Sequence, residues 1–172
     1  MFPSELLTYS KKMHSVADQI LDSSNLLKIL EKYGEVLLHG SYPLDVMYGP
    51  DIDIVVASKD IQVSSRKALD EILDLSYFQK VEYGDFVKFP RANRPNGYIL
   101  VLKTTIEEIK WEVEVWFLEN IQSEKTNFEF LRDKISEDNR IKILEAKQER
   151  ETQGITKHKL SSHELYKKVL SE

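Results

Sequence analysis

The segment from Asp51 to Ala57, with the sequence DIDIVVA, constrains the fold of this chain more than any other. It begins with alternating acidic and apolar residues and then becomes continuously apolar, which is typical of a strand inside a sheet. Side chains on a strand alternate between its faces, so Asp51 and Asp53 point the same way, about 6.6–7 Å apart. We therefore expect a buried sheet with two carboxylates on one face.

A glycine–serine pair precedes this strand. Residues 35–39, EVLLH, predict a short buried strand that ends at Gly40 and Ser41, and a brief helical turn is expected over residues 42–47. Because glycine has no Cβ, a phosphate can approach the backbone closely at Gly40. Ser41 adds a hydroxyl and an amide at the start of the turn, where unpaired N–H groups favour an anion. This order of elements predicts a phosphate-binding turn beside the two carboxylates.

A third carboxylate is expected from the strand predicted over residues 110–118. Two-metal sites for phosphoryl chemistry usually need such a group, and Glu112 and Glu114 share one face of this strand. Charged groups among so many apolar neighbours should be paired or bind a metal if they are buried. We prefer Glu114 as the third carboxylate and keep Glu112 as the reserve candidate, since it also fits the solvated face of an antiparallel strand.

These motifs together resemble the nucleotidyltransferase signature of the DNA polymerase beta-like superfamily, which includes minimal nucleotidyltransferases. The signature is read here as Gly40-Ser41, nine further residues and then Asp51-Ile52-Asp53-Ile54. The resemblance covers residues 35–118. It implies a metal-dependent nucleotidyltransferase that moves NMP from an NTP to a hydroxyl acceptor and releases pyrophosphate. It also implies that Asp51, Asp53 and Glu114 are catalytic and bind Mg²⁺ or Mn²⁺, and that Gly40 and Ser41 bind the nucleotide.

Two features depart from the superfamily pattern. The third acid is commonly Asp, whereas Glu114 stands here. A basic residue often follows the glycine–serine pair in family X polymerases, whereas this chain has Tyr42-Pro43. The triphosphate charge is then expected to meet metal and other basic residues: Lys88, Arg91, Arg94 or Lys103. The alternative function is a weak or inactive nucleotidyltransferase-fold module that binds nucleotide or a protein partner, as in toxin–antitoxin pairs.

The whole chain, residues 1–172, predicts a single α+β domain with a small mixed or antiparallel sheet and a helical C-terminal section. Helical and strand periodicities divide it into N-terminal helices over 1–34, a sheet core over 35–118 and C-terminal helices over 119–172. This arrangement is the palm-like fold that the resemblance implies.

Local signals set several boundaries within these three parts. Polar residues 22–25 are expected to break the first helix, and Gly34 is expected to cap the second. Residues 98–105 and 110–118 predict a hairpin, and a capping box from Ser161 to Glu164 predicts the start of the last helix.

Charge and composition exclude several classes of protein. The chain has 24 Lys and Arg against 29 Asp and Glu, a net charge of −5, which disfavours a sequence-independent DNA binder. It has no cysteine, so disulfides, iron–sulfur clusters and cysteine nucleophiles are excluded. Neither a signal peptide nor a run of about 20 apolar residues is present, which predicts a cytoplasmic protein without a membrane partner. The sequence leaves open the acceptor (a small molecule, a protein or an RNA end) and a homodimer.

Two further basic segments have open interpretations. Residues 86–94, FVKFPRANR, mix aromatic and basic side chains, which suits base stacking and phosphate contact but equally a solvated loop. The segment Lys157-His158-Lys159 is a similar surface candidate. His158 and His163 lie five residues apart across a helix start, which is poor spacing for metal ligands, so no metal site is expected there.

Overall fold

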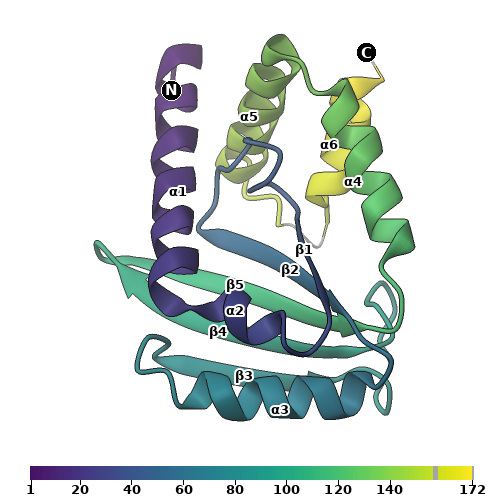
Figure 1. Cartoon of the computed structure of the whole chain (residues 1–172). Helices are drawn as coiled ribbons and strands as arrows, with labels where there is room; N and C mark the ends of the chain where they lie inside the picture. Colours follow the sequence, from purple (N-terminus) through teal and green to yellow (C-terminus); the bar gives the residue numbers. More distant parts are fainter. Residues whose placement is uncertain (157–158, 172) are drawn as a thin grey trace.

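The computed structural model describes residues 1–156 and 159–171, so Lys157 and His158 of the basic segment lie outside the described residues (Figure 1). In chain order the elements are α1 (Pro3–Ser24), α2 (Leu26–Leu30), β1 (Glu35–His39), β2 (Asp51–Ala57), α3 (Ile61–Leu73), β3 (Lys80–Asp85), β4 (Tyr98–Ile106), β5 (Ile109–Leu118), α4 (Gln122–Lys134), α5 (Glu137–Thr152) and α6 (Ser162–Leu170).

The strands form one five-stranded sheet in the order β1-β2-β5-β4-β3. Strands β2 and β5 pair in parallel, whereas the other neighbours are antiparallel, so the sheet is mixed and the α+β class is confirmed. The predicted hairpin is β4–β5. Its turn residues Glu107 and Glu108 have φ values of 47° and 66°, the left-handed conformation that tight hairpin turns require.

The main core covers one face of this sheet. Alternate residues of the central strands are fully buried there, among them Ile52, Ile54, Val113 and Val115, and they pack with α1, α2 and α3. The other face carries Asp51 and Asp53 at the start of β2. It becomes apolar further along, where Val55 and Trp116 form a separate buried cluster with Ile121. The strand alternation inferred from the sequence therefore holds.

The remaining helices form a second layer beside the sheet. Figure 1 shows α5 beside the first half of α1, with α6 and α4 beyond α5, while α3 lies at the opposite end of the molecule and packs against β4 and β5. Leu6 of α1, Leu131 of α4, Leu144 of α5 and Leu165 of α6 share one buried cluster. Ser161 caps α6 and exchanges the predicted pair of hydrogen bonds with Glu164. In the part of the chain that is described, no helix is long and apolar enough to span a membrane.

Two local expectations were wrong. Gly34 does not cap a helix, since α2 ends at Leu30. A Cβ at Gly34 would instead overlap the carbonyl oxygen of Ala57, so glycine is needed where β1 begins against β2. Residues 42–47 form no helix. Backbone bonds from Asp45 N to Tyr42 O (3.1 Å) and from Val46 N to Ser41 O (3.1 Å) close a turn, and Asp45 then adopts a left-handed φ of 54°, which ends any helical continuation.

Candidate active site

The parallel pairing of β2 with β5 brings the predicted acids together. Asp51 is directly opposite Glu112, and Asp53 is directly opposite Glu114. Paired residues on adjacent strands project to the same face, so all these carboxylates lie on one side of the sheet. Each is partly exposed, whereas Ile52 and Val113 between them are fully buried. The result is an acidic face on a rigid, buried support.

The glycine–serine turn abuts the second of these aspartates. Gly40 has a φ of +75°, and a Cβ placed on it would overlap the Asp53 carboxylate. Glycine is therefore required here for two reasons, the backbone conformation and the close approach of Asp53. On β1, His39 is opposite Asp53 in the antiparallel register. Ser41 is buried, with 7% of its surface exposed.

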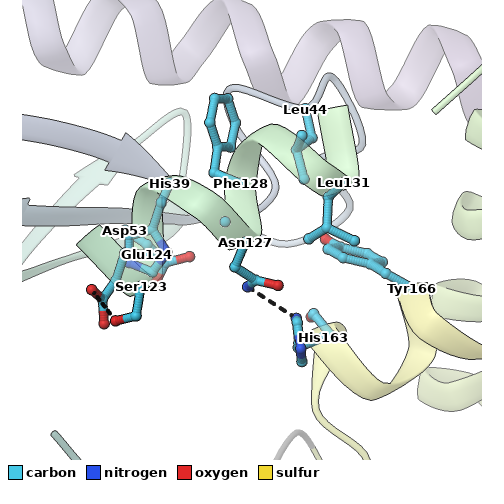
Figure 2. A pocket seen from close by; sticks show the side chains of 12 residues that line it. His39, Leu44, Asp53, Ser123, Glu124, Asn127, Phe128, Leu131, His163 and Tyr166 are labelled. Carbon is cyan, nitrogen blue, oxygen red and sulfur yellow. Dashed lines mark hydrogen bonds between the residues drawn. The ribbon is translucent and has the colours of Figure 1, made fainter. Parts of the chain in front are cut away.

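A first cavity, of about 470 Å³, lies between this turn and helices α4 and α6. Figure 2 shows Asp53, Ser123 and Glu124 gathered at one end, and Leu131 and Tyr166 together at the other. Between them, the Asn127 Nδ2 and His163 Nδ1 atoms are 3.3 Å apart (Figure 2). The cavity therefore has a polar end next to the acidic face and an apolar end inside the helical layer.

A second cavity, of about 930 Å³, lies over the acidic face itself. Its floor is Asp51, Asp53, Glu112 and Glu114, and its walls come from the β3–β4 loop and the start of α6. Both cavities share Asp53 and Ser162. Asp53 thus stands where a molecule in one cavity would meet a molecule in the other.

Burial and charge shift the pKa values of several lining groups. Burial, reinforced by the negative charges of Asp53 and Asp51, raises the pKa of Tyr166 far above its ordinary range, so the phenol stays neutral. Burial lowers the pKa of His39, against the raising effect of Glu124. Burial and then Lys167 lower the pKa of His163, while Glu164 opposes them. Both histidines are therefore held toward their neutral form.

The acidic face suits a hard divalent cation in its chemistry, because Mg²⁺ prefers carboxylate oxygens. Within the described residues, however, no three His, Asp or Glu side chains are grouped closely enough to hold a metal. Glu114 points instead toward the β3–β4 loop, where its Oε2 atom is 3.8 Å from Nη1 of Arg94. Joint ligation of one ion by Asp51, Asp53 and Glu114 thus needs Glu114 to turn away from Arg94.

The basic residues that were expected to meet the triphosphate lie on the side of the acidic face and not beside Gly40. Arg94 approaches Glu114, and Lys103 lies between Glu82 (3.4 Å) and Glu112 (3.2 Å). Arg91 and Lys88 lie over the rings of Phe86 and Phe89, respectively. Among the described residues that line the first cavity, none is a lysine or an arginine.

Sequence reasoning did not find the groups that α4 and α6 contribute to the site. Asn127, His163 and Tyr166 are far from the Asp-x-Asp segment in sequence, and helical packing alone brings them to it. The capping box at Ser161 predicted where α6 starts, but it carried no signal that this start faces the acidic strands. Arg94 was identified as basic, but not as the partner of Glu114.

Comparison with solved structures identifies this architecture. The chain is similar to the Cid1 poly(U) polymerase, with a TM-score of 0.65 and 18% identity over 98% of this chain and 52% of that one. It is also similar to a cytoplasmic RNA terminal U-transferase (TM-score 0.62, 13% identity, 95% of this chain and 52% of that one). The chain has a nucleotidyltransferase fold.

A third structure with this nucleotidyltransferase fold is the polymerase core of TRAMP, an RNA surveillance complex, with a TM-score of 0.59 and 18% identity over 91% of this chain and 48% of that one. The chain spans about half the length of these three polymerases. No known family and no curated protein matches the sequence. The expected palm-like fold is thus confirmed by structure.

Proposed function

We propose that this chain is a metal-dependent nucleotidyltransferase that moves NMP from an NTP to a hydroxyl acceptor. The observation that carries this proposal is the paired register of Asp53 with Glu114, directly beside Gly40. It supplies carboxylates from two adjacent strands and a backbone approach for phosphate in one place. The nucleotidyltransferase fold that the chain shares with the similar solved structures supports the proposal.

The nucleotide is proposed to occupy the first cavity. Gly40 and Ser41 would bind its phosphates through the backbone of the turn. The apolar end near Leu131 and Tyr166 suits a base, while Asn127 and His163 offer hydrogen-bonding groups between the two ends. This placement puts the α-phosphate next to Asp53, at the junction with the second cavity.

The acceptor is proposed to enter the second cavity, over Glu114. Its hydroxyl oxygen forms a bond to the α-phosphorus while the bond from that phosphorus to the bridging oxygen breaks, and pyrophosphate leaves. Glu114 can take the hydroxyl proton or hold the metal next to it. Bound Mg²⁺, held by Asp51, Asp53 and Glu114, would supply charge neutralisation for the triphosphate.

Two cationic side chains in the wall of the second cavity offer contacts to an acceptor that carries phosphate. Arg94 and Lys159 both line it, although its floor is acidic. Nucleic-acid ends meet this requirement, and two of the similar proteins are named as a poly(U) polymerase and an RNA terminal U-transferase. We therefore rank an RNA end ahead of an uncharged small molecule or a protein hydroxyl.

A matched pair of variants tests the proposal. Glu114→Gln and Glu112→Gln make the same change on the same face of β5 and in the same cavity, but only Glu114 is proposed as a catalytic carboxylate. Incorporation of labelled nucleotide into an RNA end with Mg²⁺ should fall about a hundredfold or more in Glu114→Gln and little in Glu112→Gln. Equal losses, or equal activity, would contradict the assignment of Glu114.

The second candidate is a module that binds nucleotide or a protein partner without turnover. The absence of a closely grouped metal site among the described residues favours it. Calorimetric titration of each NTP with Mg²⁺ separates the two candidates, using Asp51→Asn/Asp53→Asn as the reference. Metal-dependent binding that the double variant loses supports the transferase. A folded wild-type protein that binds no NTP supports a protein-binding module.

A further inference from the structure

The turn that follows β1 is anchored by groups outside the proposed site. It runs from Gly40 to Val46 and is closed by two backbone hydrogen bonds. Its first residue and Asp45, near its end, both have left-handed φ values, +75° and 54°. A non-glycine residue such as Asp45 keeps this conformation only where the surroundings hold it. The side chains around Asp45 and Tyr42 show what holds it.

One histidine of α1 contacts both ends of this turn. The ring of His14 stacks on Tyr42 with the centroids 4.4 Å apart and the planes at 19°. Its Nε2 atom is 3.3 Å from Oδ1 of Asp45, and its Nδ1 atom is 3.3 Å from Oδ2 of Asp18. The Tyr42 hydroxyl donates a 2.7 Å hydrogen bond to the other Asp18 oxygen. The contacts thus form a closed ring from α1 through the turn and back.

A second helix completes the anchor. Arg140 of α5 places Nη2 3.5 Å from Oδ2 of Asp45, so this carboxylate lies between a histidine and an arginine. These two partners of Asp45 come from helices that are distant from it in sequence. Lys11 of α1 and Glu137 of α5 line the same small cavity as His14 and Asp45.

Both ring nitrogens of His14 face a carboxylate oxygen, that of Asp18 on its own helix and that of Asp45 on the turn. The face of the same ring stacks on Tyr42. His14 therefore joins α1 to the turn both through its ring face and through its ring edge.

We propose that His14 is a positioning residue that orders the turn carrying Gly40 and Ser41 and so increases nucleotide affinity. The part about affinity rests on the proposed function, whereas the ordering of the turn does not. Tyr42 takes part through its stacking on His14 and its bond to Asp18. This is a role for the tyrosine that stands where family X polymerases often have a basic residue.

The first experiment measures the turn without nucleotide. Hydrogen exchange of a peptide covering residues 40–47 is compared between wild type and His14→Gln under the same conditions. We expect about fivefold faster exchange in His14→Gln. Equal exchange in the two proteins would overturn the proposal.

The second experiment measures nucleotide affinity in the same two proteins. His14→Gln should raise the KM for NTP about fivefold with kcat unchanged. Tyr42→Phe should also raise KM, since it loses the bond to Asp18. Tyr48→Phe is the matched control, because Tyr48 contacts Tyr9 and is not one of the residues described above as contacts of His14.

The outcomes separate the two proposals. Altered exchange in a protein that binds no NTP would leave the ordering of the turn standing, but would overturn both the proposed function and the effect on affinity. Normal NTP binding with no difference between wild type and His14→Gln would overturn the positioning role alone. A kcat loss equal to the KM change would also overturn it, because that pattern indicates a group acting in the transition state.

Discussion

Asp53 is the residue of β2 that pairs with both His39 of β1 and Glu114 of β5, and its carboxylate lies against the Cα atom of Gly40. One side chain therefore links the glycine–serine turn, the neighbouring histidine and the Glu114 carboxylate. Because Asp53 also lines both cavities, a small displacement of its carboxylate would alter the proposed nucleotide side and the proposed acceptor side together.

Gly40→Ala tests this contact. The left-handed φ alone should cost about 1–2 kcal/mol, and the added Cβ should also push the Asp53 carboxylate away from the turn. Gly154→Ala is the matched control, since Gly154 has a φ of +66° and nothing within 4 Å of an added Cβ. Chemical denaturation should show the cost of the left-handed φ in both variants, and NTP titration should show loss of binding in Gly40→Ala only. Binding retained by Gly40→Ala would contradict the proposed phosphate approach.

Lys147 tests how the helical layer holds the end of the same turn. This side chain is 3% exposed, and its Nζ atom donates a 2.6 Å hydrogen bond to the carbonyl of Val46. Lys147→Met keeps much of the volume but removes the donor, so unfolding free energy should fall by about 1–3 kcal/mol. Lys142→Met, on the exposed side of α5, should change it by less than about 0.5 kcal/mol. Urea denaturation measures the free energy of unfolding of both variants. Equal values for the two would show that the buried hydrogen bond of Lys147 does not stabilise the protein.

His163 predicts how stability depends on pH. Its pKa lies below the ordinary value of 6.5 in the folded state, chiefly through burial. The unfolded chain therefore binds this proton more readily, so its contribution to stability is complete above the ordinary pKa and is lost as the pH falls below it. Denaturation at a series of pH values should show a smaller loss on acidification in His163→Gln than in wild type. Identical slopes would exclude His163 as a contributor.

Much of the acidic face could be predicted because its signals are local. Alternation in DIDIVVA fixes which residues of β2 share a face, and the same holds for Glu112 and Glu114 on β5. The hairpin, the break in the N-terminal helix and the cap of α6 are likewise set by neighbouring residues. The proposed roles of the acids, and the single-domain organisation, stay predictions.

What the sequence did not predict depends on long-range packing. Nothing in β2 or β5 alone says that they pair in parallel with Asp53 opposite Glu114. The wall formed by α6 and the ring around His14 depend on helices that meet only in the folded chain. The brief helical turn expected over 42–47 is a non-helical turn for the same reason, because Asp45 has a left-handed conformation and contacts partners on α1 and α5.

The contact between Arg94 and Glu114 predicts an effect on metal binding. Arg94 Nη1 lies 3.8 Å from Glu114 Oε2, and both groups are partly exposed, so the pair is weak but competes with a cation for the carboxylate. Arg94→Gln should therefore tighten Mg²⁺ binding by about two- to fivefold in calorimetric titrations without nucleotide. Arg91→Gln is the control. This substitution removes the same charge from the same loop, but Arg91 lies over the ring of Phe86 and not beside Glu114. Equal tightening in both variants would assign the effect to net charge, and no tightening in Arg94→Gln would mean that Glu114 is not a ligand.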